Sequence, residues 1–178
     1  MKKKTLNSIE LLEYQPNRYP FLMIDYVTKV VPGKIANGYK NFTNNEWFFP
    51  IHFPGHPNVP GALQLEAMAQ MLTVAITTLP GNKGKVTHAI SHNVRFRREI
   101  VPGEKLIIET KVLSWKRGLC KGLGKGIVSG EIACEAEMTI TIPEILDKYI
   151  PKKKTWMKKE KTDILIIGTG ASGAASAW

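Results

Sequence analysis

Residues 49–70, FPIHFPGHPNVPGALQLEAMAQ, place two imidazoles, those of His52 and His56, and one carboxyl group, that of Glu66, in a short segment. His52 precedes Phe53-Pro54-Gly55, a rigid stretch that restrains the backbone next to the imidazole. Glu66 interrupts an apolar run, where a carboxyl withdrawn from water would have a raised pKa and could serve as a general acid. A neutral histidine can act as a base near neutral pH. The pattern predicts an acid–base pair, although each residue alone also has a structural explanation.

Pro60-Gly61 begins the one long helix that the sequence predicts, residues 61–77. The free N–H groups and positive dipole of a helix start can stabilise negative charge on a carbonyl oxygen, and glycine allows that oxygen to approach. Gln70 lies one turn after Glu66, where it could hydrogen-bond to Glu66 or to a substrate. Together these groups suit removal of a proton beside a carbonyl and loss of a β-leaving group, the elimination of water.

The segments around this helix predict an α+β fold. Apolar residues occupy nearly every face of the helix, so it should be buried on most sides. A short helix or turn is expected within 5–14, with Ser8 as its cap. Strands are expected within residues 21–31, 34–43, 86–97, 105–117 and 124–142, and the glycines of 118–126 are interpreted as a turn. The helix should lie across the concave face of a curled antiparallel sheet.

Composition excludes some classes of protein. Of 178 residues, 43% are hydrophobic and 22% charged, as in ordinary globular domains, and no apolar run reaches the roughly 18–20 residues of a membrane span. The N-terminus lacks the apolar centre of a signal peptide, which predicts a cytoplasmic protein. Two cysteines and four histidines show no metal-ligand spacing, so no metal is expected.

The net charge of +10 fits either an anionic partner or a surface of solvated lysines without a specific partner. Nucleic acid, anionic lipid and acidic protein all fit this charge, but the basic residues lack the interleaved aromatic side chains of a nucleic-acid stacking surface.

The last residues form a segment of their own. Residues 151–178 begin with a lysine cluster and end in DILIIGTGASG, which has the G-x-G-x-x-G spacing after a strand-like run. The chain stops five residues after Gly173, too early for the second strand and acidic residue of a dinucleotide site. We therefore expect one domain over residues 1–150 and, over 151–178, a basic linker with a non-functional tail that resembles the truncated start of a Rossmann-type flavoprotein.

The segment HFPGHPNVPGALQLEAMAQ resembles the signature of the (3R)-hydroxyacyl-[acyl-carrier-protein] dehydratases of the FabZ type. The blocks NRYPFLMIDYV, KNFTNNEWFFP, VRFRREIVPGEKL and GKGIVSGEIACEAEMTI resemble the same family in the same order, over about residues 10–142. The resemblance implies a hotdog fold, in which a curled antiparallel sheet wraps around the long helix. It also implies a homodimer with shared active sites, which can assemble into a hexamer as a trimer of dimers.

The resemblance assigns roles to individual residues. His52 would remove the α-proton, and Glu66 of the partner chain would protonate the departing β-hydroxyl group. The N–H of Gly61 would bind the thioester oxygen, and Phe53 and Gln70 would contact the substrate. The substrate would arrive on the phosphopantetheine arm of acyl carrier protein, and no cofactor is implied. The basic candidates for docking that acidic partner are Arg95, Arg97, Arg98 and Lys105.

Three positions depart from the family pattern: Ile51 replaces a glycine, Val59 replaces a methionine, and Asn17 replaces a histidine. None removes an acid–base residue, but Ile51 adds a branched side chain beside His52. The preferred acyl chain length therefore stays open, as does the choice between fatty acid synthesis and a specialised lipid or polyketide-like pathway. A hotdog acyl thioesterase and a non-catalytic protein that binds acyl carrier protein are the alternatives.

Overall fold

The computed structural model describes residues 4–150. The predicted linker and tail, residues 151–178, lie outside the described part. In chain order the elements are β1 (Lys4–Leu6), α1 (Ser8–Leu11), β2 (Tyr26–Val31), β3 (Ile35–Asn41), α2 (Gly61–Thr77), β4 (His88–Phe96), β5 (Lys105–Lys116), β6 (Leu119–Val128), β7 (Glu131–Thr141) and α3 (Pro143–Leu146). The strands form one sheet in the order β1-β2-β3-β5-β6-β7-β4.

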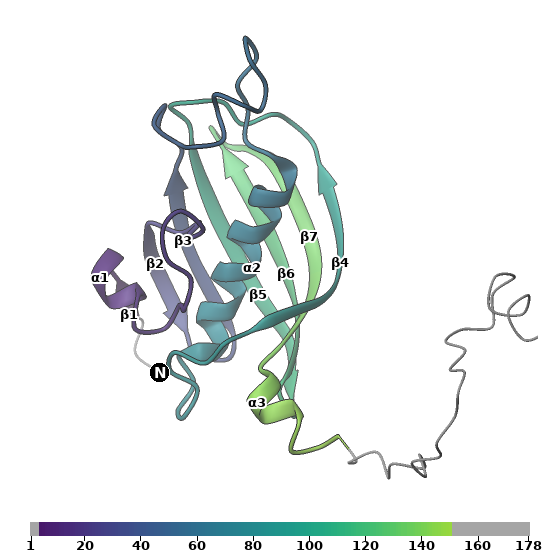
Figure 1. The fold of residues 1–178 in the computed structure, drawn as a ribbon. Coiled ribbons are helices and arrows are strands. Elements are labelled where there is room, and N and C mark those ends of the chain that lie inside the picture. The colour runs from purple at the N-terminus through teal and green to yellow at the C-terminus, as the bar shows by residue number, and fades with distance from the viewer. Residues whose placement is uncertain (1–3, 151–178) are drawn as a thin grey trace, which may run out of the picture.

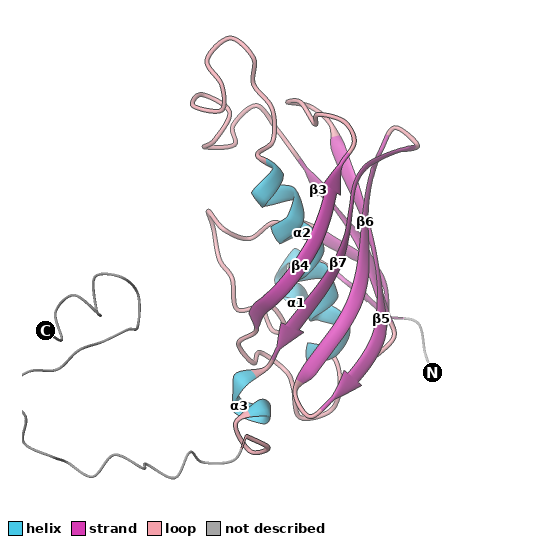
Figure 2. Ribbon diagram, turned by 90° about the vertical axis from the view of Figure 1, so that its right-hand side faces the viewer, coloured by secondary structure: helices cyan, strands magenta, loops and turns pink. Residues whose placement is uncertain are grey.

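The sheet is antiparallel throughout and curls around α2. Figure 1 shows α2 lying across one face of the sheet, and Figure 2, turned by 90°, shows the helix along one side of the curved strands. This arrangement confirms the predicted α+β hotdog fold.

Helix α2 has the predicted bounds and the predicted burial. Twelve of its 17 residues are buried, which follows from the apolar side chains on nearly every face. It packs against β3, β5, β6 and β7. No helix within residues 4–150 is both long and apolar enough to cross a bilayer.

The prediction of a glycine-rich turn over residues 118–126 holds only for Gly118 and is wrong for residues 119–126, because these form most of β6. A Cβ atom on Gly122 would lie 2.6 Å from Leu72 Cδ1, and one on Gly124 would lie 3.0 Å from Met68 Cβ. The glycines therefore face α2 and let the helix lie close to the sheet. The turn between β5 and β6 takes only Arg117 and Gly118, and a further turn at Ser129-Gly130, both with positive φ, divides the strand expected over 124–142 between β6 and β7.

The predicted N-terminal helix is present, but its cap is Asn7 rather than Ser8. Asn7 Oδ1 accepts hydrogen bonds from the N–H groups of Ile9 and Glu10, each at 2.9 Å. The Glu10 side chain accepts from the N–H of Asn7 in return, which completes a capping box. Ser8 becomes the first residue of the helix.

Candidate active site

His52 lies in the loop between β3 and α2, where the backbone fixes its imidazole in one tautomer. The His52 N–H donates to the carbonyl oxygen of Phe48 at 2.9 Å, and the Asn58 N–H donates to the carbonyl oxygen of His52 at 2.9 Å. Nδ1 lies 3.1 Å from the carbonyl oxygen of Asn58. Because a carbonyl oxygen can only accept, the proton of the neutral ring is on Nδ1 and Nε2 keeps its lone pair. Nε2 is therefore available as a base.

Aromatic residues on both sides of His52 hold this loop. Phe48 and Phe49 are buried and pack edge to face with ring centroids 4.7 Å apart. Phe53 stacks on the imidazole with centroids 4.2 Å apart, and its ring remains largely exposed. Phe48 and Phe49 thus anchor the loop to the core on the N-terminal side of His52. On the C-terminal side, the Phe53 ring provides an apolar surface beside the imidazole.

Glu66 and Gln70 form the expected contact across one turn of α2. The half-buried carboxylate of Glu66 accepts a hydrogen bond from Gln70 Nε2 at 2.7 Å. Gln70 is fixed from the other side, because its Nε2 also donates to the carbonyl oxygen of Phe21 and its Oε1 accepts from the N–H of Met23, each at 2.8 Å. The buried amide of Gln70 therefore orients the carboxyl group of Glu66.

Gly61 occupies the first position of α2, where the N–H groups of the first turn have no partner within the helix. A Cβ atom at this position would lie 2.9 Å from Cζ of Phe96. Glycine thus keeps space between the helix start and the Phe96 ring.

Glu66 lies on helix α2, whereas His52 lies in the loop between β3 and α2. Glu66 lines a groove of about 170 Å³ between α2 and strands β4 and β7. Gly61 lines a separate pocket of about 370 Å³, and His52 lines neither. The groove beside Glu66 runs along β4, which is an edge strand of the sheet. Among the pockets described within residues 4–150, none is lined by both Glu66 and His52.

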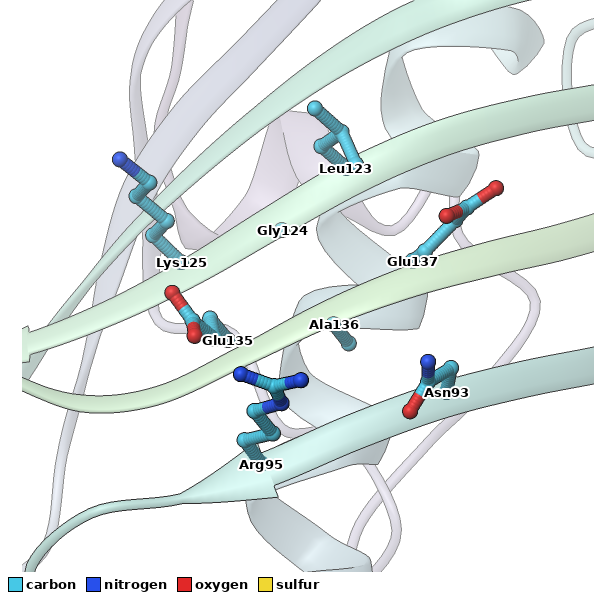
Figure 3. Close-up of a pocket in the computed structure, with 8 residues that line it drawn as sticks. All are labelled: Asn93, Arg95, Leu123, Gly124, Lys125, Glu135, Ala136 and Glu137. Carbon is cyan, nitrogen blue, oxygen red and sulfur yellow. The ribbon is translucent and has the colours of Figure 1, made fainter.

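The four basic residues predicted to dock a partner each lie close to other side chains of the same chain. Arg95 lies on the sheet face away from α2, beside Glu135 and Lys125 in a pocket of about 260 Å³ (Figure 3). Arg97 pairs with Glu135, and Arg98 donates to Glu104 at 2.7 Å. The Lys105 ammonium lies 4.3 Å from the ring centroid of Tyr39. Their docking role stays a prediction.

Within residues 4–150, no group of three or more His, Cys, Asp and Glu side chains is placed to hold a metal ion. Cys120 and Cys134 are both buried and unpaired as free thiols. Burial raises the pKa of the Cys120 thiol to about 12 and that of the Cys134 thiol to about 11. Neither thiol is activated for nucleophilic chemistry.

Comparison with known proteins agrees with the fold and the motifs. The model of the FabA-like domain matches residues 15–137. A 3-hydroxyacyl-[acyl-carrier-protein] dehydratase FabZ of Moorella thermoacetica is 42% identical over 133 residues, 74% of this chain and 93% of that protein. The FabZ of Bacillus subtilis is 40% identical over 140 residues, 78% of this chain and 99% of that protein. This chain belongs to the FabZ family.

Solved structures with low sequence identity share the fold of this FabZ family member. The dehydratase heterocomplex ApeI:P from Xenorhabdus doucetiae aligns with a TM-score of 0.66 and 17% identity, over 80% of this chain and 97% of that chain. The uncharacterized protein PH1136 from Pyrococcus horikoshii aligns with a TM-score of 0.55 and 14% identity, over 70% of this chain and 86% of that chain. These likenesses concern the fold alone.

Proposed function

We propose that the chain dehydrates (3R)-hydroxyacyl thioesters on acyl carrier protein to trans-2-enoyl thioesters. His52 Nε2 removes the α-proton, and the electron pair moves to the thioester oxygen, which the N–H of Gly61 binds. The β-hydroxyl group then leaves as water with a proton from Glu66. Gln70 orients the carboxyl group of Glu66, and Phe53 supports the imidazole and the substrate beside it.

The observation that carries this proposal is the likeness to FabZ relatives at about 40% identity over most of both chains. The tautomer of His52 supports it independently. A base must offer a free lone pair, and the Asn58 carbonyl oxygen holds the ring proton on Nδ1, away from Nε2.

A homodimer completes the site in this proposal. None of the described pockets is lined by both His52 and Glu66, and the groove beside Glu66 borders the edge strand β4, whose Ile90 and Phe96 side chains are about half exposed. A second copy paired along this edge would bring its own His52 to Glu66 of the first. We further propose assembly of dimers into a hexamer, a cytoplasmic location, and docking of the acidic carrier protein by the basic residues named above.

The test is conversion of a 3-hydroxyacyl thioester to product, followed by the ultraviolet absorbance of the conjugated enoyl thioester. His52→Ala should lower kcat by about 10²–10⁴-fold, because a general base contributes a factor of that size. His56→Ala is the matched control. It removes an exposed imidazole that pairs with Glu99, and it should leave kcat nearly unchanged. A loss smaller than tenfold for His52→Ala would contradict the assigned base.

The same assay separates the alternatives by product. A thioesterase would release free thiol without a conjugated double bond. A carrier-binding protein without catalytic activity would bind acyl carrier protein and produce neither signal.

A further inference from the structure

The guanidinium group of Arg18 binds four backbone carbonyl oxygens in the segment that joins α1 to β2. Nη1 donates at 2.7, 3.0 and 2.9 Å and Nη2 at 3.0 Å; the acceptors, in that order, are Gln15, Pro16, Asn17 and Leu12. Residues 12–18 are turn and irregular chain, so their path is not set by the repeating hydrogen bonds of a helix or sheet. The planar, charged guanidinium group supplies fixed donors instead.

The chain on both sides of Arg18 holds Gln70 of α2 at three points. The buried side chain of Gln15 donates from Nε2 to the main-chain carbonyl oxygen of Gln70 at 3.3 Å. The carbonyl oxygen of Phe21 accepts from Gln70 Nε2, and the N–H of Met23 donates to Gln70 Oε1, each at 2.8 Å. Arg18 connects these points, because its side chain binds Gln15 and its carbonyl oxygen accepts from the N–H of Phe21 at 2.8 Å.

We propose that Arg18 is a positioning residue for Glu66 and acts through Gln70. This inference rests on the proposed function, in which Glu66 protonates the leaving hydroxyl group. Gln70 Nε2 carries two hydrogens, one for the Phe21 carbonyl oxygen at 2.8 Å and one for Glu66 at 2.7 Å. Because the amide is planar, its bond to Phe21 sets the direction of its bond to Glu66. Arg18 is exposed and does not line the groove beside Glu66, so it acts from outside the site.

A change of leaving group tests this role, because only a hydroxyl group needs the acid. The substrates are a (3R)-hydroxyacyl thioester and its analogue in which fluorine replaces the hydroxyl group. In both, His52 takes the α-proton, and the electron pair of that C–H bond forms the double bond. The C–O pair leaves as water only when the oxygen gains the proton of Glu66, whereas the C–F pair leaves as fluoride, a weakly basic anion. The leaving-group ratio is kcat/KM for the hydroxyl substrate divided by kcat/KM for the fluoro substrate.

Arg18→Met should lower the leaving-group ratio by about 3- to 10-fold, the size of effect that one hydrogen bond has. Gln70→Leu should lower the ratio at least as far. Adding Arg18→Met to Gln70→Leu should lower it no further, because the amide through which Arg18 acts is already gone. A general loss of structure would slow both substrates alike and leave the ratio unchanged.

Arg117→Met is the matched control, because this exposed arginine lies in the turn between β5 and β6, over the ring of Tyr149. It should leave both rates and their ratio unchanged. An unchanged ratio in Arg18→Met, or a further fall when Arg18→Met is added to Gln70→Leu, would overturn the proposal. If Arg18→Met fails to fold, Arg18→Lys decides. Its single ammonium group cannot replace both guanidinium nitrogens, so an unchanged ratio in Arg18→Lys would overturn the proposal equally.

A third variant separates this inference from the proposed function. Glu66→Gln should lower the leaving-group ratio by about 10²–10⁴-fold, because it removes the acid itself. A fall in Glu66→Gln without any fall in Arg18→Met would overturn only the role of Arg18. If the unmodified protein converts neither substrate, or if Glu66→Gln leaves the ratio unchanged, the proposed function fails, and crystal structures then test the positioning. Gln70 Nε2 should be within hydrogen-bond distance of Glu66 in the unmodified protein and displaced in Arg18→Met; an undisturbed contact would overturn the inference.

Discussion

At the scale of single residues, the environment rather than the residue type separates the two histidines of the HFPGHP segment. His52 donates through Nδ1 to a backbone carbonyl and stacks on Phe53, whereas His56 is exposed and pairs with Glu99. Of the two histidines, only His52 is therefore held by a carbonyl oxygen in the tautomer that leaves Nε2 free. The surroundings likewise decide the reactivity of the Cys120 and Cys134 thiols.

We predict that Cys120 and Cys134 do not react with a disulfide reagent at pH 8 in the folded protein. Burial raises the two pKa values to about 12 and about 11, so the reactive thiolate is nearly absent. Both thiols should react once denaturant unfolds the chain, as seen in the absorbance of the released thiolate. Rapid reaction of either thiol without denaturant would contradict their placement in the core.

The same shifts predict a loss of stability at alkaline pH. The unfolded thiols titrate near 9.0, below the pKa values of the folded thiols, so above about pH 9 the unfolded state binds fewer protons than the folded state. The free energy of unfolding should therefore fall as pH rises from about 9 to about 12. A variant with both cysteines replaced by alanine should lose this component in denaturant titrations.

At the scale of elements, the contact between α2 and β6 depends on the absence of side chains on the strand. The alternating glycines of β6 face the helix, and lysines and Leu123 alternate with them on the other face. Apolar bulk comes from the helix instead, through Met68 and Leu72. Because the bulky side chains come from α2 and not from β6, the helix lies close against the sheet.

We expect Gly122→Ala to lower the free energy of unfolding by about 1–3 kcal/mol, because its methyl group would overpack the contact with Leu72. Lys121→Ala, on the opposite face of the same strand, should cost less than about 0.5 kcal/mol. Leu72→Ala added to Gly122→Ala should cost less than the sum of the single changes. Urea unfolding measures the free energy of unfolding of the three single variants and of the double variant. If the costs of Gly122→Ala and Leu72→Ala simply add, direct contact between these two residues is contradicted.

A buried lysine joins β3 to the loop that carries His52. The Lys40 side chain is 11% exposed, and its Nζ lies 3.2 Å from Asp25 Oδ1 and 2.8 Å from Glu46 Oε1. Asp25 also accepts from the N–H of Asn41 at 2.7 Å. The ion pair with Glu46 therefore ties the start of the His52 loop to the sheet.

Lys40→Met should lower the free energy of unfolding by about 3 kcal/mol, because it leaves two carboxylates near each other without their cation. The control is Lys83→Met. It breaks an ion pair with Glu13 in which both side chains are more than half exposed, so solvent screens the pair and the variant should lose far less stability than Lys40→Met. Equal losses in thermal or chemical unfolding would mean that burial of the Lys40 pair contributes nothing.

At the scale of the whole molecule, the sheet has a free edge next to the groove of the proposed acid. Strand β4 pairs on one side with β7 and forms the end of the sheet. An unpaired strand edge can pair with another chain. The proposal that two copies of the chain share each active site can be tested by mixing inactive variants.

Neither His52→Ala nor Glu66→Gln should be active alone, but a refolded equal mixture should recover about a quarter of the normal activity. Random pairing makes half of the dimers mixed, and each mixed dimer has one intact site of two. Sedimentation should show dimers or larger assemblies throughout. No recovery in a mixture that does form mixed dimers would show that each site lies within one chain.

The sequence alone determined the bounds of α2, the antiparallel α+β class and the contact between Glu66 and Gln70, because apolar periodicity and helical spacing are local properties. It could not identify β6, whose glycines resemble a turn until the side chains of α2 are placed against them. Nor could it predict the Asn7 cap, the Lys40 ion pairs or the carbonyl contacts of Arg18. These features join segments distant in the chain or depend on backbone geometry, so only the tertiary structure decides them.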